Sequence, residues 1–167
     1  MKLKRQSTNT TNSMAANKKV NKTKMWVCFI AYLLLLGYVV FISSGFGRVD
    51  QGEYRYNLTL LHEIGRYYSI GVKTGNWTLF RFNVIGNICV FIPLGIFLPK
   101  LFARCRKLLT VAVLSLEISL GIEVIQLVTR IGSFDVDDLL LNTIGGILGY
   151  LIYRIVSGVC HLFGKGR

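Results

Sequence analysis

The sequence is poor in charge and holds no cysteine or histidine framework. Of its 167 residues, 17% are charged, whereas soluble globular domains have about a quarter. The cysteines stand singly in the sequence and share no CxxC spacing, which excludes a disulfide scaffold and a cysteine metal site: Cys28, Cys89, Cys105 and Cys160. Together with a mean hydropathy of +0.49, these features exclude an ordinary soluble domain.

The apolar residues are gathered into long blocks. Four blocks are each long enough to cross a bilayer core of about 30 Å, which takes about 20 residues of helix. They cover residues 25–43, 84–102, 108–128 and 139–160. The first block is too long for a signal peptide and lacks a small-x-small cleavage site, so it is read as a retained helix. We therefore expect an all-α integral membrane four-helix bundle in residues 25–160.

The distribution of basic residues predicts the orientation of this bundle. The net charge is +12, and fourteen of the 20 basic residues lie before the first block, from Lys100 to Lys107 at the junction of the second and third blocks, or from Arg154 onward. None of the eight acidic residues lies there. The positive-inside rule places that side, with both termini, in the cytoplasm. Anionic lipid headgroups explain the basic termini better than a nucleic-acid partner does.

The segments outside the spans have different characters. Residues 1–24 are rich in Asn, Thr, Ser and Lys and predict a disordered basic tail, and residues 161–167 form a second cytoplasmic tail. The external loop, residues 44–83, has apolar residues at helical spacing from Tyr54 to Tyr68. This spacing predicts an extracytoplasmic amphipathic helix at the headgroup level.

Polar side chains gather where the predicted spans reach the outer surface. Charged and amide groups are costly inside a membrane and usually face the bundle interior, where they mark a site. The candidate ligand-binding residues come from the start of the second span, the end of the third and the start of the fourth: Asn83, Asn87, Glu123, Gln126, Arg130, Asp135, Asp138 and Asn142.

Each of these residues also has a structural interpretation. Asp135 is placed to cap the fourth helix, while Asp137 and Asp138 suit its macrodipole. The asparagines suit hydrogen bonds between helices, and Gly145 with Gly149 permits close approach of a neighbouring helix. The convergence of so many polar groups at one height favours a site.

Glu117 is set apart from this cluster. It lies nearly halfway along the third span, on a different part of the helix surface from Glu123. If it is buried there, we expect it to be neutral and hydrogen-bonded.

Several motifs resemble the VanZ-like family. They are residues 86–95 (GNICVFIPLG), 122–126 (IEVIQ), Arg130, 134–139 (FDVDDL), 141–146 (LNTIGG) and Gly149. The resemblance covers residues 57–153, beginning with Asn57 and Leu58, and departs at Thr59 and Leu60, where the family has a proline-containing segment. It implies a bacterial plasma-membrane protein whose relatives lower susceptibility to teicoplanin-like lipoglycopeptides. It implies no known reaction.

Three functions fit these observations. The first is a non-enzymatic factor that binds a membrane lipid or a lipid-linked cell-wall precursor, with Arg130 on a phosphate or carboxylate. The second is an enzyme that modifies an envelope lipid, with Glu123 and Asp135 or Asp138 as acid and base, or as ligands of a hard cation such as Mg²⁺. The absence of a nucleophile or histidine in the cluster weighs against it, and we expect no cofactor. The third is a small transporter or flippase, which requires a homo-oligomer.

Overall fold

The chain folds into helices that run between two polar ends. The computed structural model describes residues 2–41 and 55–164. Its elements, in chain order, are α1 (Lys2–Phe41), β1 (Tyr56–Asn57), α2 (His62–Thr74), α3 (Thr78–Phe80), η2 (Arg81–Ile85), α4 (Gly86–Leu101), η3 (Ala103–Arg106), α5 (Leu108–Thr129), β2 (Phe134–Asp135) and α6 (Val136–Gly164). Residues 44–54 of the predicted external loop and 165–167 of the predicted tail lie outside the described residues.

Within the described residues, four stretches are long and apolar enough to cross a membrane, which confirms the predicted helical membrane fold. They are Lys22–Phe41, Thr78–Leu101, Leu108–Thr129 and Val136–Cys160. Helices satisfy their own backbone hydrogen bonds, as a membrane span requires. The second span begins six residues earlier than predicted because η2, one turn of π-helix, joins α3 to α4.

Helix α1 extends beyond its apolar part. It begins at Lys2, whereas the sequence predicted disorder in residues 1–24. Residues 2–24 contain neither glycine nor proline. Once the apolar span is helical, each residue added to the helix therefore gains a hydrogen bond without a new nucleation step.

The external helix differs from its prediction in position. The helix expected from Tyr54 to Tyr68 is α2, which begins at His62. Tyr56 and Asn57 instead form β1, which pairs in parallel with β2 in the register Tyr56 with Phe134 and Asn57 with Asp135. The expectation of helix before His62 is therefore wrong, because contacts with a distant segment override the local spacing of apolar residues.

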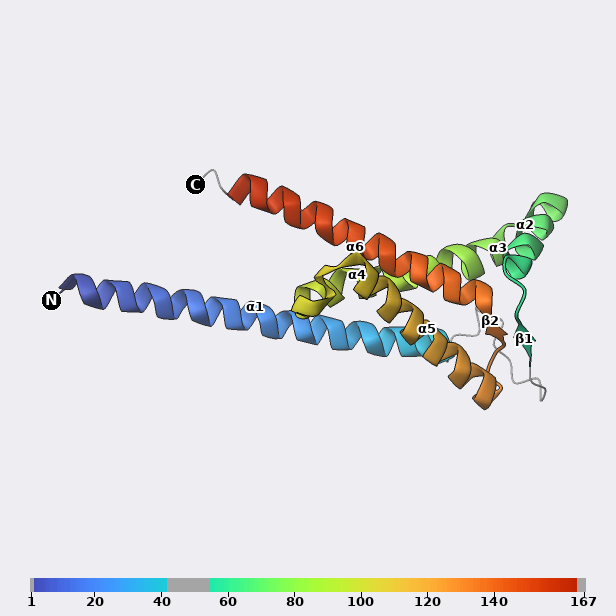
Figure 1. The fold of residues 1–167 in the computed structure, drawn as a ribbon, viewed down its shortest axis with the longest axis horizontal. Coiled ribbons are helices and arrows are strands. Elements are labelled where there is room, and N and C mark those ends of the chain that lie inside the picture. Colours follow the sequence, from blue (N-terminus) through green and yellow to red (C-terminus); the bar gives the residue numbers. More distant parts are fainter. Residues whose placement is uncertain (1, 42–54, 165–167) are drawn as a thin grey trace.

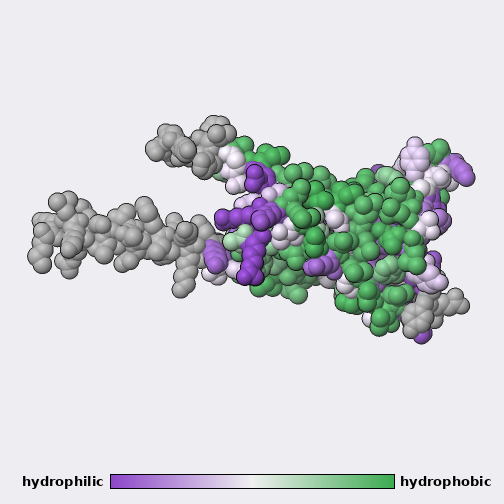
Figure 2. Space-filling view, viewed as in Figure 1, coloured by the Kyte–Doolittle hydropathy of each residue, from purple (hydrophilic) through white to green (hydrophobic). Residues whose placement is uncertain are grey.

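The two polar ends of the molecule are formed by different segments of the chain. Figure 1 shows the start of α1 and the end of α6 at one end and α2, β1 and β2 at the other, which we call the α2 end. Figure 2 shows an apolar belt between these ends, as a membrane protein requires. Both observations agree with the prediction of apolar spans between two polar regions.

Glycines bring α4 and α6 into close contact. A Cβ atom at Gly149 would lie 2.0 Å from the Ile92 carbonyl oxygen, and one at Gly95 would lie 2.0 Å from the Gly146 carbonyl oxygen. A Cβ at Gly145 would lie 2.3 Å from the Ile88 carbonyl oxygen. Gly145 and Gly149 therefore pack against α4, and Gly95 packs against α6, so the predicted close approach is intramolecular.

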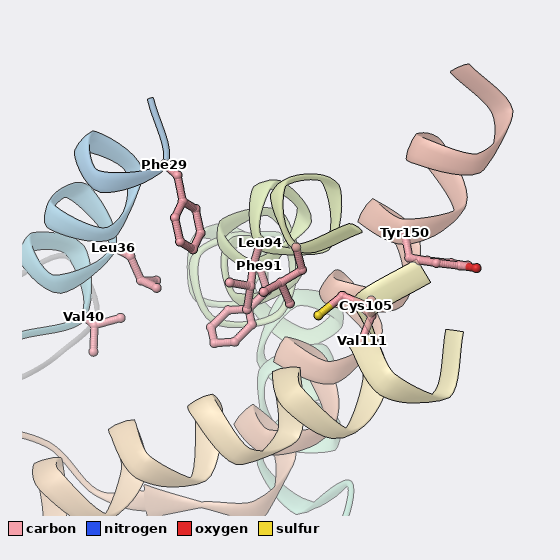
Figure 3. Close-up of a cluster of buried hydrophobic side chains, with 9 residues drawn as sticks. Phe29, Leu36, Val40, Phe91, Leu94, Cys105, Val111 and Tyr150 are labelled. Carbon is pink, nitrogen blue, oxygen red and sulfur yellow. The ribbon is translucent and has the colours of Figure 1, made fainter. Parts of the chain in front are cut away.

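The apolar core lies between α1, α4, α5 and α6 (Figure 3). Phe91 and Leu94 of α4 are at its centre, with Phe29 and Leu36 of α1 on one side. Helix α1 is also held by the Tyr32 hydroxyl, which donates to the Val90 carbonyl oxygen at 2.9 Å. The core thus fixes α1 against α4.

Glu117 does not enter the bundle. The buried face of α5 consists of Val111, Ser115, Ser119, Glu123 and Gln126. Glu117 is exposed, about half a turn from that face, so the burial on which the expectation of a neutral, hydrogen-bonded acid depended does not occur. The repeat of 3.6 residues places it opposite the faces that pack.

Candidate functional site

At the α2 end, Asp135 accepts hydrogen bonds from two segments of the chain. This residue directly precedes α6, and its Oδ1 accepts hydrogen bonds from the Asp137 N–H at 2.9 Å and from Asn57 Nδ2 at 3.0 Å. The first contact caps α6, as its position in the sequence suggested, and the second joins β1 to β2. Burial raises the pKa of the Asp135 carboxyl above its ordinary value.

Asp137 holds the external helix in place. Only 1% of the residue is exposed, and its carboxylate accepts three backbone N–H groups, from Leu61 at 2.5 Å, Glu63 at 2.9 Å and Ile64 at 3.2 Å. These are donors at the start of α2 that have no partner within that helix. Leu61 reaches Asp137 with a φ of 62°, a left-handed backbone that is uncommon outside glycine.

The role of Asp137 was not found from the sequence. Its position at the start of α6 pointed to the macrodipole of its own helix. The structure uses it instead to cap α2, more than 70 residues earlier. The signal in the sequence was that the start of α6 has more than one aspartate, whereas a single one is enough to cap this helix.

A small cavity lies between the spans near the α2 end. Polar side chains from three helices line it: Asn87 of α4, Glu123 of α5, and Asp138 and Asn142 of α6. The apolar part of its wall is Val39, Val40, Val90, Phe91 and Ile122. Its volume is about 10 Å³, which is enough for one water molecule. The structure thus brings four of the eight predicted site residues to one cavity.

Hydrogen bonds fix these four side chains. Asn87 Nδ2 donates to Asp138 Oδ1, and Asn142 Nδ2 donates to Ser119 Oγ at 2.9 Å. Glu123, which is 1% exposed, accepts the Asp135 N–H through Oε2 at 3.0 Å. The polar groups are therefore held in place by α4, α5, α6 and β2 before any ligand arrives.

The other predicted residues lie outside the cavity wall. Gln126 is buried, and its Nε2 donates to the Val40 carbonyl oxygen at 3.1 Å, so it ties α5 to α1. Asn83 donates to the Leu79 carbonyl oxygen within its own helical segment. Arg130 is exposed and ends α5 with a φ of 59°. Their places in the chain predicted the correct end of the molecule but not the direction of each side chain.

Two serines on α5 were missed by the sequence analysis. Ser115, Ser119 and Glu123 follow one another at intervals of four, and all three are buried. Ser119 accepts the hydrogen bond from Asn142, whereas Ser115 Oγ has no partner among the described residues. Their regular spacing in an apolar helix was the signal that marked this polar stripe.

The external helix carries an exposed ion pair. Burial of Glu63 opposes its charge, but hydrogen bonds from Arg66 outweigh this effect and hold the pKa of Glu63 below its ordinary value. Arg66 Nε lies 2.8 Å from Glu63 Oε2. The pair lies near the surface, so solvent screens it and it is of little use to a buried site.

Among the side chains that the structure describes, no three His, Cys, Asp or Glu residues are grouped so that they could hold a metal ion. Glu123 and Asp138 do line the same cavity.

The sequence was also compared with known proteins. The sequence model of the family described as VanZ/LLP1 matches residues 29–157. Protein VanZ of Enterococcus faecium is 40% identical over 82 residues, which cover 49% of this chain and 48% of that relative. The match thus spans about half the length of the curated relative. No solved structure matches the chain.

Proposed function

Because this chain belongs to the VanZ/LLP1 family, we propose that it is a bacterial plasma-membrane factor that contributes to tolerance of teicoplanin-like lipoglycopeptides. In this proposal it binds the headgroup of a lipid or of a lipid-linked cell-wall precursor at the outer membrane face. Such binding would limit access of the antibiotic to its target.

The observation that carries the proposal is the cavity at the α2 end. Asn87, Glu123, Asp138 and Asn142 converge there from three helices. Polar groups at membrane depth are costly and usually mark a functional site, and a cavity of this size can receive one water-sized polar group of a headgroup. The hydrogen bonds that fix these groups give a preorganised site, which reduces the cost of binding.

The location of the cavity supports the outer face. It lies near the end opposite the basic segments of the chain, and the positive-inside rule assigns basic segments to the cytoplasm. The α2 end then meets the outer leaflet. Tyr68, Trp77 and Phe80, which pack against one another beside α2, suit the headgroup level.

Antibiotic tolerance in cells tests this proposal. Expression of the wild-type chain in a susceptible Gram-positive host is expected to raise the minimal inhibitory concentration of teicoplanin, and Glu123→Ala is expected to remove the effect. Glu117→Ala is the matched control, because Glu117 is an acid on the same helix that is exposed and does not line the cavity. Equal tolerance with both variants at equal expression would show that the cavity is not the site of action.

One observation supports the enzyme alternative. Glu123 and Asp138 line the same cavity, which an acid and base acting on one substrate require. Asp135 fits this role less well, because its Oδ1 is used by Asn57 and Asp137. A change in the mass of an envelope lipid with the wild type, absent with Glu123→Gln, would favour the enzyme over the binding factor.

A further inference from the structure

We propose that the exposed face of α5 around Glu117 binds a second copy of this chain, with the two Glu117 carboxyl groups hydrogen-bonded to each other across the dimer. Glu117 does not line the cavity, and all the residues of the cavity wall come from one chain. Each copy therefore carries a complete cavity. The proposal goes beyond the proposed function, and a monomeric Glu117→Ala variant remains a control for the cavity.

The depth of Glu117 in its span supplies the first argument. It lies near the middle of the span Leu108–Thr129, at least nine residues from either end. At a rise of about 1.5 Å per residue, this distance is about 14 Å or more along the helix. Lysine and arginine can reach the membrane surface from inside a span because their side chains are long, whereas a glutamate side chain is shorter. Glu117 therefore lies at the depth of the hydrocarbon core.

The described chain provides no partner for Glu117. Its side chain is exposed, and no described residue forms a hydrogen bond or an ion pair with its carboxyl group. The basic residues within the described spans lie toward the ends of those spans: Lys22, Lys24, Arg81, Lys100 and Arg154. Ionisable groups in membranes almost always face other protein, where they pair with one another or with backbone groups. The exposed face of α5 therefore lacks a neighbour at this depth.

The chemistry of the carboxyl group selects a second copy as that neighbour. A carboxylate ion is very costly in hydrocarbon, so a span that faces lipid admits the protonated acid. The protonated acid has one O–H donor and also accepts hydrogen bonds, so two such groups can donate to each other. A twofold axis along the membrane normal brings a residue on the axis to its own counterpart. A second copy thus presents the matching group at the same depth, whereas a helix of another protein needs a polar residue of its own there.

The residues around Glu117 suit a packed pair of helices. Val113, Leu120 and Val124 are exposed and apolar. Together with Glu117 they follow one another at intervals of four, three and four, which is the spacing of the seam between two packed helices. Gly121 lies one turn after Glu117, is exposed, and has open space where a Cβ atom would be. A small residue at this position lets the backbone of a neighbouring helix approach closely.

The oligomeric state of the purified full chain tests the proposal. In liposomes at decreasing protein density, single-molecule photobleaching is expected to show a dimer for the wild type. Glu117→Leu keeps the surface apolar and removes both hydrogen bonds, so it should weaken the association by about 10-fold or more. Glu117→Gln is the matched variant, because an amide also donates and accepts, and it should retain the dimer.

Further variants locate the interface. Gly121→Leu fills the exposed face of α5 and should weaken the association, whereas Gly158→Leu, at an equally open glycine of α6, should not. In a background without the native cysteines, Val124→Cys is expected to form a disulfide between two copies when the membranes are oxidised. Leu151→Cys, on the exposed face of α6, is expected to remain a free thiol.

Three results would overturn the proposal. A wild-type chain that is monomeric at every density has no such interface. A dimer that persists unchanged in Glu117→Leu and Gly121→Leu, with both variants shown to be folded by their melting temperatures, forms through another surface. A cross-link in cells from Val124→Cys to a different membrane protein, without a cross-link between copies, assigns this face to a foreign helix.

Discussion

Asp135 and Asp137 carry the same side chain and use it differently. Asp135 accepts its two hydrogen bonds through Oδ1. Asp137 uses both oxygens, with Leu61 on Oδ1 and with Glu63 and Ile64 on Oδ2. An asparagine has one acceptor oxygen, so it can replace the first aspartate but not the second.

At this scale, we predict that Asp137→Asn destabilises the protein by about 1–3 kcal/mol, because an amide NH₂ then faces at least one backbone N–H at the start of α2. Asp135→Asn is expected to change stability little, or to raise it at neutral pH. Burial raises the pKa of Asp135, so the folded state pays for its charge, and this cost falls as the pH drops through the raised pKa.

Thermal unfolding in detergent as a function of pH checks both variants, with proteolysis near residue 61 as a local probe. Equal melting temperatures for wild type and Asp137→Asn would show that the carboxylate does not hold α2.

At the scale of elements, the pair α4 and α6 depends on glycine. Gly149 and Gly158 lie on the same helix in opposite situations. A Cβ atom at Gly149 would lie 2.0 Å from the Ile92 carbonyl oxygen and 2.9 Å from Gly95 Cα, whereas one at Gly158 meets nothing within 4 Å. Close approach of backbones through small residues is a common way to pack helices in membranes.

We therefore predict that Gly149→Ala costs about 1–3 kcal/mol, because α4 and α6 must separate to admit the methyl group. The same change at Gly158 should be neutral or stabilise the helix by up to about 1 kcal/mol, since alanine is the better helix former. Melting temperatures of the two variants in the same detergent decide this, and a larger loss for Gly158→Ala would contradict the observed packing.

For the molecule as a whole, the functional interpretation depends on orientation. Lys73 at the end of α2 and Lys107 before α5 lie outside the spans and are exposed. In a background without the native cysteines, we predict that Lys73→Cys reacts with a membrane-impermeant maleimide in intact cells. Lys107→Cys is expected to react only after permeabilisation. The reverse pattern would place the cavity at the cytoplasmic face and remove the basis for antibiotic exclusion.

The sequence by itself determined the helical membrane fold and the end of the molecule where polar groups collect. Both depend on local properties: the length of each apolar run and the position of charges beside it. The third span illustrates this, because its predicted end differs from that of Leu108–Thr129 by one residue. Asn87, Glu123, Asp138 and Asn142 could be selected in the same way, as polar residues at matching heights.

Only the tertiary structure decided which polar groups meet. Asp137 caps a helix more than 70 residues away, β1 replaces part of a predicted helix because it pairs with β2, and Glu117 faces out of the bundle. Gln126 binds the backbone of α1, whereas Glu123, three residues earlier, lines the cavity. Helical spacing gives the relative directions of side chains on one helix, but the partner of each depends on how all four spans pack.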